Sequence, residues 1–251
     1  MRERVKVSII TPMFNAADYI AETIESVLNQ SHQNWELLIS DDCSSDNSVA
    51  LVNEYVAKDE RIKLFCNTEN SGPAETRNRS LSNATGRFMA FLDADDLWSP
   101  NKLEEQLHFM LNKSIGFSFT EFHRFKGNIE GERVSVPKTI VYSELLKNTA
   151  IATSTVLIDT KFVSWPIKMR QVYYDDFVLW LEILKRESKA YGLQSDLMAY
   201  RVLPGSVSRN KLNSAVEVWK TYRVIEKINI LKSAWFFVNW TFNAVKKYRK
   251  F

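Results

Sequence analysis

The sequence predicts an α/β fold with a mostly parallel, doubly wound central sheet, followed by an α+β half and C-terminal amphipathic helices. Apolar and β-branched runs alternate with segments of helical periodicity through the first hundred residues, an alternation typical of parallel sheets with crossover helices. Several of these runs end in carboxylates, at the edge where open α/β sheets bind ligands. The chain has 251 residues, 45% of them hydrophobic, which suffices for one domain with a sizeable core.

Four strands are expected in the first half, because four short apolar runs end at turn or polar residues. The first run ends at Pro12, the second at Asp41 and Asp42, the third at a polar loop and the fourth at three carboxylates. The expected strands are 5–11, 35–40, 62–66 and 87–92.

Helices are expected between these strands. Ile20, Ile24 and Val27 recur at helical spacing, Ser48 follows a run of capping residues, and Pro73 suits the first turn of a helix. These signals predict helices at 18–29, 48–57 and 73–83. Beyond them we expect a helix at 100–111, a strand at 115–125, a turn at 126–132, a strand at 134–141, and a short helix that leads into a strand within 145–158.

Three carboxylates lie within four residues directly after the fourth strand: Asp93, Asp95 and Asp96. Because side chains alternate along a strand, Asp93 and Asp95 should project to the same side. Two crowded carboxylates repel each other unless a cation neutralises them, and Mg²⁺ or Mn²⁺ suits such oxygen ligands together with substrate phosphates. The alternative is a solvated loop in which Asp96 or Ser99 caps the next helix.

A second acidic pair, Asp175 and Asp176, comes just before an apolar helix face that includes Phe177 and Trp180. One interpretation is capping and complementation of the helix dipole. The other is a general base, a carboxylate that takes the proton from an attacking hydroxyl group.

Four motifs occur in order at the expected strand ends: I-I-T-P-M-F-N, L-L-I-S-D-D-C-S-S-D, N-S-G-P-A-E-T-R-N and F-L-D-A-D-D-L-W. Together they resemble the family-two inverting glycosyltransferases of the A-type fold, of the bacterial surface-polysaccharide type, over about residues 5–208. No G-x-G-x-x-G follows the first strand, which argues against a dinucleotide-binding protein.

The resemblance implies a donor-nucleotide site made of Thr11, Pro12, Phe14, Asp42, Arg77, Asp93, Ala94 and Asp95. In this assignment the residues after the first strand line the uracil and ribose pocket, and Asp42 hydrogen-bonds the base. Arg77 reaches the base or the diphosphate, Asp93 holds the ribose or sugar, and Asp95 ligates Mn²⁺ or Mg²⁺. The family more often has tyrosine at the position of Phe14.

On the acceptor side the resemblance makes Asp176 the catalytic base and Asp175 its supporting neighbour, where the family commonly has glutamate. Trp180, Arg201 and Ser208 are assigned more loosely to the acceptor or diphosphate side. The implied function is inverting transfer of a hexose or N-acetylhexosamine from a UDP-sugar to a hydroxyl of a lipid-linked saccharide, in O-antigen, capsule or lipopolysaccharide synthesis.

Two other classes of protein remain in view. A sugar nucleotidyltransferase would use a similar sheet, but it would need a glycine-rich, basic loop after the first strand, and residues 11–15 contain neither glycine nor lysine. A non-catalytic carbohydrate- or lipid-binding module would not need the second acidic pair.

The chain divides into a nucleotide-sugar-binding half (1–98), an acceptor-binding and catalytic-base half of the same domain (99–210), and a basic, aromatic helical tail (211–251). Aromatic residues beside basic ones suit an anionic membrane surface; the alternative is a tail packed on the catalytic domain. Net charge is only +3 and no binding motif accompanies the tail, so nucleic acid is not an expected partner.

Cys43 and Cys66 form no spaced motif, which suggests a reducing compartment. No signal-peptide pattern and no apolar run of roughly 20 residues, as a membrane span requires, is present in the sequence. We therefore expect a cytoplasmic protein, peripheral on the inner face of the bacterial cytoplasmic membrane.

Overall fold

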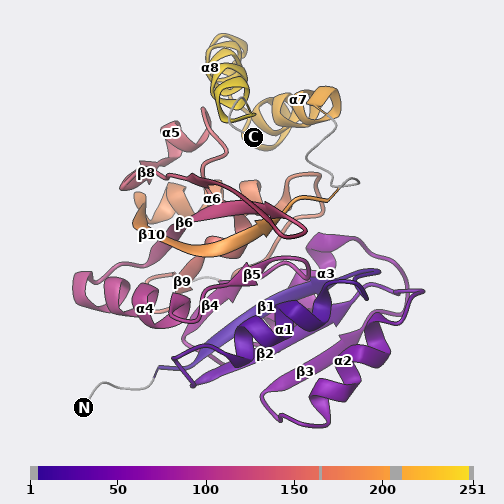
Figure 1. Cartoon of the computed structure of the whole chain (residues 1–251). Helices are drawn as coiled ribbons and strands as arrows, with labels where there is room; N and C mark the ends of the chain where they lie inside the picture. The colour runs from indigo at the N-terminus through magenta and orange to yellow at the C-terminus, as the bar shows by residue number, and fades with distance from the viewer. Residues whose placement is uncertain (1–4, 164–165, 204–210, 249–251) are drawn as a thin grey trace.

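The computed structural model describes residues 5–163, 166–203 and 211–248 (Figure 1). Its N-terminal half is a parallel sheet in the order β3-β2-β1-β4, with three crossover helices. The strands are β1 (Val7–Met13), β2 (Trp35–Asp41), β3 (Ile62–Cys66) and β4 (Phe88–Phe91), and the helices are α1 (Ile20–Leu28), α2 (Ser48–Val56) and α3 (Pro73–Ser82). All seven elements occur where the sequence predicts them.

The sheet continues beyond β4 with mixed strand directions, in the order β9-β6-β10-β5. β9 runs antiparallel to both β4 and β6, whereas β10 runs parallel to β6. The strands are β5 (Leu97–Trp98), β6 (Phe117–Lys126), β9 (Leu157–Asp159) and β10 (Lys189–Arg201). The purely parallel part is thus confined to the first four strands.

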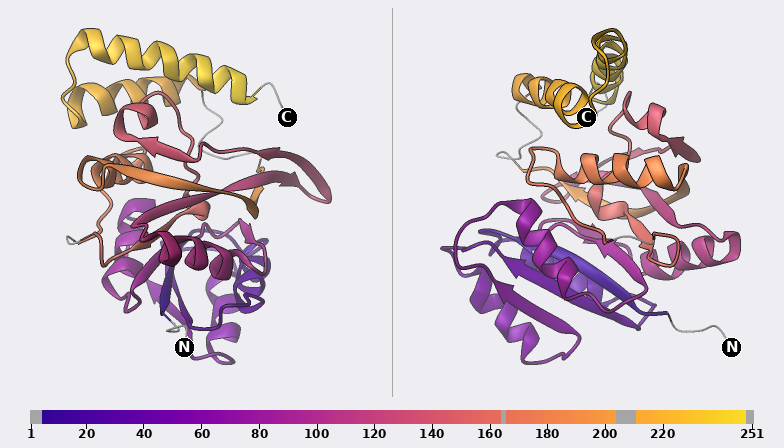
Figure 2. Two further views of the ribbon diagram at one scale, coloured as in Figure 1. Left: turned by 90° about the vertical axis from the view of Figure 1, so that its left-hand side faces the viewer. Right: turned by 180° about the vertical axis from the view of Figure 1, so that it is seen from behind.

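Helices cover both faces of the sheet, so the doubly wound prediction is confirmed. Ile9 packs with α1, α2 and α4 (Lys102–Lys113), while its neighbour Ile10 packs with α3 and α6 (Asp175–Arg186), as the alternation of side chains along a strand requires. Figure 1 shows the first group in front of the sheet, and the right-hand view of Figure 2 shows the second group on the opposite side.

One hairpin differs from the prediction. The expected turn at 126–132 is only two residues long, because Lys126 already pairs with Ile129. Gly127 has φ +56°, a left-handed conformation that glycine adopts without strain and that a tight hairpin turn requires. The expected strand at 134–141 is therefore replaced by two short ones, β7 (Ile129–Val134) and β8 (Thr139–Val141).

Pro12 does not end the first strand as expected. β1 continues to Met13, and Pro12 lies in register with Ser40 of β2. Because β1, β2 and β4 are parallel, their carboxyl ends and the loops that follow meet at one edge of the sheet.

The tail forms a helical pair at one end of the molecule (Figures 1 and 2). It consists of α7 (Lys211–Lys220), a π-helical turn η3 (Thr221–Ile225) and α8 (Ile230–Tyr248), next to α5 (Tyr142–Leu145). Val218 and Tyr222 are fully buried in the core cluster that also contains α6, and the Tyr222 hydroxyl donates to the Leu146 carbonyl. Across the described ranges, no helix combines the length and apolarity that crossing a membrane would take.

Candidate active site

The three carboxylates after β4 lie in a tight turn. The Asp96 N–H donates to the Asp93 carbonyl at 3.1 Å. Asp93 and Asp95 are partly exposed, whereas Ala94 and Asp96 are buried. The turn therefore presents Asp93 and Asp95 towards the carboxyl edge of the sheet and turns Asp96 inwards.

Asp96 anchors this turn. Its carboxylate accepts hydrogen bonds from the Ser154 hydroxyl at 2.6 Å and from the Arg201 N–H at 3.1 Å. Burial, together with the charges of Asp95 and Asp93, raises the pKa of Asp96 well above its usual range. A buried, internally bonded carboxyl of this kind holds the loop in place, which differs from the helix-capping alternative.

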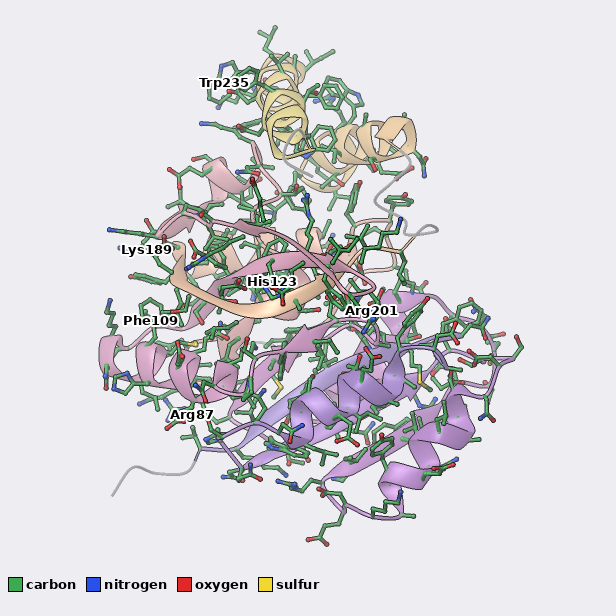
Figure 3. All side chains as sticks on the ribbon, viewed as in Figure 1. Arg87, Phe109, His123, Lys189, Arg201 and Trp235 are labelled. Atoms are coloured by element: carbon green, nitrogen blue, oxygen red, sulfur yellow. The ribbon has the colours of Figure 1, made fainter. Side chains whose placement is uncertain are left out.

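Arg201, the last residue of β10, also fixes the turn. Its Nε donates to the backbone carbonyl of Asp95 at 2.7 Å, and its Nη2 pairs with Glu22 of α1 at 2.6 Å. The guanidinium also lies 4.5 Å from the Phe125 ring centroid. Figure 3 places Arg201 where the two halves of the chain meet. Its contacts connect the acidic turn with α1 and β6.

Asp95 is the carboxylate best suited to a metal ion. No described residue donates a side-chain hydrogen bond to it. Burial and the neighbouring charge of Asp93 raise its pKa to about 6, so a divalent cation would offset an unfavourable concentration of negative charge. No cluster of three or more metal-type ligands occurs in the described part of the chain, but Mg²⁺ is usually held by one or two carboxylates plus substrate phosphates. The donor set therefore fits such an ion.

Arg77 joins the two acidic centres. From α3 its Nη2 donates to Asp93 at 2.6 Å and its Nη1 donates to Asp175 at 2.8 Å, and its side chain is only 9% exposed. Burial lowers the pKa of Arg77, and the charges of Asp93 and Asp175 more than compensate, so its net pKa shift is upwards. The two carboxylates that the sequence placed 82 residues apart, at 93 and 175, thus share one buried cation.

The second acidic pair occupies the N-terminus of α6. Asp175 is buried against Arg77, and burial is the main reason that its pKa rises to about 6. Asp176 is partly exposed. Its carboxylate accepts hydrogen bonds from the Thr153 hydroxyl and from the Phe177 N–H, each at 2.6 Å. Asp176 is therefore accessible and oriented, as a general base must be.

A short 3₁₀ turn, η1 (Thr153–Thr155), contacts both acidic centres. Thr153 holds Asp176, while the adjacent Ser154 hydroxyl bonds Asp96 and accepts the Asp93 N–H at 3.1 Å. The Trp98 indole N–H fixes the Ser154 carbonyl at 2.8 Å. In the sequence these residues are only small and polar, and the structure shows that they position the acidic side chains.

Directly after β2, Asp42 organises the loop before α3. Its carboxylate accepts bonds from the Ser71 and Gly72 N–H groups and from the Asn67 side chain, at 2.8 to 2.9 Å. Burial opposes ionisation, but these hydrogen bonds lower the net pKa of Asp42. A direct bond from Asp42 to a base stays a prediction, since the loop already uses both oxygens.

The last residues of β1 and the first residue after it differ in accessibility. Phe14 is 52% exposed, so its ring is free to pack on a base. Thr11 is completely buried and its hydroxyl has no hydrogen-bond partner among the described residues, so its side chain does not line an open pocket. Pro12 is partly exposed beside it.

The resemblance assigns Trp180 and Ser208 to the acceptor or diphosphate side. Trp180 is 1% exposed and packs edge-on against Phe91, with ring centroids 5.2 Å apart. The prediction that it contacts the acceptor is therefore corrected: it is a core residue, because α6 turns this face towards the sheet. Ser208 lies outside the described residues.

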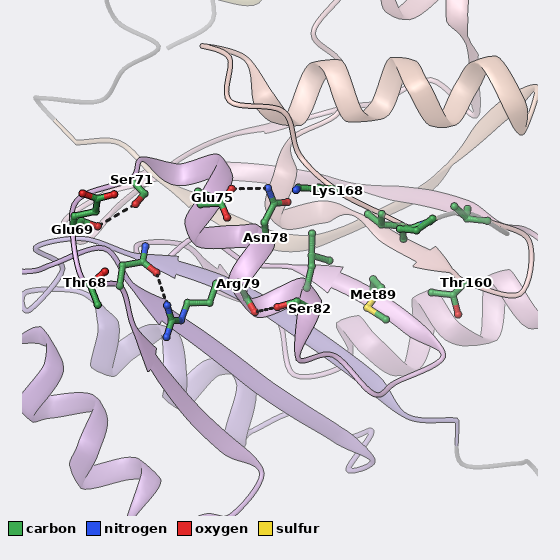
Figure 4. A pocket seen from close by; sticks show the side chains of 15 residues that line it. Thr68, Glu69, Ser71, Glu75, Asn78, Arg79, Ser82, Met89, Thr160 and Lys168 are labelled. Carbon is green, nitrogen blue, oxygen red and sulfur yellow. Dashed lines mark hydrogen bonds between the residues drawn. The ribbon is translucent and has the colours of Figure 1, made fainter.

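A cavity of about 780 Å³ runs along the outer side of α3 (Figure 4). Its lining includes Glu75, Asn78, Arg79 and Lys168 but none of the aspartates of the two acidic centres. Asn78 is already paired with the backbone of Met169 through both its amide atoms. The cavity is thus separate from the carboxylates that carry the candidate chemistry.

Comparison with known proteins places this arrangement in context. The family model described as glycosyl transferase family 2 matches residues 8–173. TuaG of Bacillus subtilis (strain 168), named provisionally as a teichuronic acid biosynthesis glycosyltransferase, is 43% identical over 247 residues, which cover 96% of either chain. WfgD of Escherichia coli, named UDP-Glc:alpha-D-GlcNAc-diphosphoundecaprenol beta-1,3-glucosyltransferase, is 37% identical over 96% of this chain and 94% of its own.

Two solved structures share the fold. S. aureus TarS 1-349 in complex with UDP-GlcNAc superposes with a TM-score of 0.76 at 19% identity, over 94% of this chain and 71% of that chain. The mannosyltransferase PcManGT from Pyrobaculum calidifontis, in complex with GDP-Man and Mn²⁺, has a TM-score of 0.72 at 16% identity, over 98% of this chain and 75% of that chain.

Proposed function

The chain belongs to glycosyl transferase family 2 and has the A-type glycosyltransferase fold, and from this premise we propose an inverting, metal-dependent transfer of a hexose or N-acetylhexosamine from a UDP-sugar. The observation that carries the proposal is the buried Arg77, which bonds Asp93 on one side and Asp175 on the other. It brings an acidic turn suited to a metal–diphosphate and an acidic pair suited to a base into one site. Neither a binding module nor simple helix capping needs that connection.

In this proposal Asp176 takes the proton from the acceptor hydroxyl. Thr153 and the helix N–H of Phe177 hold its carboxylate in one orientation, and a positioned base contributes typically 10² to 10⁴ in rate. The hydroxyl attacks the anomeric carbon from the face opposite the departing diphosphate in one step, so an α-linked donor gives a β-linked product.

The donor side holds the leaving group. Asp95, with substrate oxygens, would hold Mn²⁺ or Mg²⁺, which supplies neutralisation of the departing diphosphate. Asp96, Ser154 and Arg201 keep the turn rigid beneath it. Phe14 packs on the uracil ring, and the loop that Asp42 secures closes the pocket.

The acceptor is proposed to be a lipid-linked saccharide in bacterial surface-polysaccharide synthesis. Support comes from the relatives: WfgD is named for transfer to a sugar on diphosphoundecaprenol, and TuaG for teichuronic acid synthesis. Such an acceptor is anchored in a bilayer, so we place the protein peripherally on the inner face of the cytoplasmic membrane.

The test is a comparison of Asp176→Asn with the wild type. With UDP-glucose or UDP-N-acetylglucosamine, Mn²⁺ and a lipid-linked acceptor, transfer by the variant should fall by about a hundredfold or more. Its affinity for UDP with Mn²⁺, measured by calorimetry, should stay nearly unchanged. Glu182→Gln, on the same helix but paired with Arg170, is the matched control and should keep normal turnover.

Two results would decide against parts of the proposal. Normal turnover by Asp176→Asn would remove the base assignment. Equal UDP binding with Mn²⁺ and with EDTA would remove the metal from the donor site. A wild type that binds GDP or dTDP in place of UDP would correct the donor nucleotide but leave the base assignment standing.

A further inference from the structure

The last helix, α8, has two apolar faces, and only one is covered. Phe236, Phe237 and Trp240 are partly buried against the core cluster that contains α6. The opposite side exposes four apolar residues, here called the outer stripe: Leu231 (82%), Trp235 (54%), Val238 (67%) and Phe242 (72%). The structure thus shows that the tail packs on the catalytic domain and still leaves an apolar face free.

The outer stripe is continuous. Its members are separated by four, three and four residues, the spacing that places side chains on one line of an α-helix. At 1.5 Å per residue the stripe is about 16 Å long. Single exposed apolar residues are ordinary, but a contiguous row of large ones marks an interaction surface.

The segment that carries the outer stripe has charge of one sign. The last 25 residues, from Lys227 onwards, contain six basic residues and no acidic one. Lys227 and Lys232 are exposed at the start of α8, and the Lys147 ammonium lies 4.4 Å from the Trp235 ring centroid. The nearest acid in sequence, Glu226, is 1% exposed and paired with Lys185, so it does not offset this positive charge.

We infer that the outer stripe docks the protein on an anionic lipid surface, with its apolar side chains in the headgroup–acyl boundary. Large apolar and aromatic side chains flanked by lysines are the composition that binds such an interface, and lysines and arginines near the surface add electrostatic attraction to anionic lipid. The inference names the membrane contact of the proposed function, and it holds whichever sugar is transferred.

The outer stripe also lies far from the candidate active site. Figure 3 shows Trp235 at the end of the molecule formed by the tail, well away from Arg201 beside the acidic turn. A change on the stripe should therefore alter membrane binding without altering the donor site, which allows the two to be tested separately.

The experiment is co-sedimentation of the full chain with vesicles of phosphatidylcholine, with and without about 30% phosphatidylglycerol. The test variant is L231Q/W235Q/V238Q/F242Q, in which glutamine keeps helix propensity. The control is L111Q/I129Q, which changes exposed apolar residues of α4 and β7. The wild type and the control should bind the anionic vesicles, and the test variant should bind at least about tenfold more weakly.

Three results would overturn the inference. The first is binding of the test variant as tight as that of the wild type. The second is wild-type binding that is equal on neutral and anionic vesicles. The third is a wild type that ignores vesicles and forms a dimer, seen by sedimentation velocity, that the test variant loses; the occupant would then be a second copy of the chain. UDP affinity of all three proteins, measured in parallel, reports on the proposed function independently.

Discussion

The two acidic centres share one arrangement of aspartates around Arg77, but they differ in the partner of the second aspartate. In each, two aspartates face one site and the first of them bonds Arg77: Asp93 in the turn after β4, Asp175 at the start of α6. The second aspartate of the turn, Asp95, has no side-chain donor among the described residues, whereas the second of the helix, Asp176, is held by the Thr153 hydroxyl. A carboxylate that binds a cation must keep free oxygens, and a base must be pre-oriented. The partner of the second aspartate, more than the acidic pair itself, thus separates the two proposed roles.

The exposed fraction of the first aspartate also differs between the two centres. Asp93 is 31% exposed beside Arg77, whereas Asp175 is 7% exposed on the other side of the same guanidinium. The acidic turn after β4 is therefore the more solvent-exposed centre, while the helix pair is accessible mainly at Asp176. Arg77 is the element that both share, so removing it should produce the largest effect.

Arg77→Ala should destabilise both centres together. It removes a buried cation from between two carboxylates, and breaking a buried ion pair in this way typically decreases the free energy of unfolding by about 3 to 5 kcal/mol. Denaturant titration of the metal-free protein measures the loss. UDP binding with Mn²⁺ should fall in parallel, because Asp93 would no longer be fixed beside Asp95.

The matched control for Arg77 is an exposed pair. Lys220 bonds Glu217 at 2.7 Å with 57% of its side chain exposed, so Lys220→Ala should change stability by less than about 1 kcal/mol. Arg77→Lys keeps the charge but loses the fork that reaches both aspartates, and it should give an intermediate loss. Equal stability of Arg77→Ala and Lys220→Ala would mean that the two acidic centres are not coupled through Arg77.

The donor half of the fold was predictable from the sequence because its signals are local. Each strand is a short apolar run, each helix has its own spacing, and Pro73 marks the start of α3. The contacts of Arg77 were not predictable in the same way. Its two partners are 16 and 98 residues away, and only the packing of α6 beside α3 brings them together.

The same limit applies to individual residues. Trp180 follows an acidic pair in sequence, but its face of α6 is the buried one. Asp42 comes at a strand end as expected, yet its oxygens are taken by a loop nearly thirty residues on. Ser154 carried no distinctive signal at all, because a serine hydroxyl between two polar neighbours is also an ordinary turn residue.

Thr153→Val tests the difference between the second aspartates directly. Valine preserves the shape but removes the hydroxyl that orients Asp176, so kcat should fall by about tenfold, the size expected for one lost orienting hydrogen bond. UDP affinity should not change, since Asp95 does not depend on Thr153. Thr153→Ser keeps the hydroxyl and should restore most of the rate.

A control separates positioning from simple destabilisation. The Thr160 hydroxyl donates to the Arg87 carbonyl, outside both acidic centres, so Thr160→Val should leave kcat unchanged. If Thr153→Val and Thr153→Ser lost equal activity, the hydroxyl would have no positioning role. A rise in the UDP dissociation constant in Thr153→Val would likewise show that the two second aspartates are not independent.

The smallest expected effect is the dependence of folding stability on pH. It distinguishes Asp175, at the start of α6, from Asp95, in the turn after β4. The pKa of Asp175 and that of Asp95 are both raised to about 6 from 3.8, so the folded chain binds protons that the unfolded chain releases. Stability from these carboxyls therefore increases as the pH falls through 6, by about 1 kcal/mol for Asp175 between pH 7 and pH 5.

Chemical denaturation in EDTA should show this slope in the wild type and a flatter one in Asp175→Asn and in Asp95→Asn. Adding Mn²⁺ and UDP-glucose should then affect the pH dependence of the two centres differently. A cation that occupies Asp95 competes with its proton, whereas in the proposed function Asp175 contacts Arg77 and not the ligand. With metal and donor present, the contribution of Asp95 to the pH dependence of folding stability should disappear, and the contribution of Asp175 should persist. If ligand suppressed both slopes equally, the protonation of Asp175 would also depend on the bound donor. The two acidic centres would then be coupled through Arg77 and not independent.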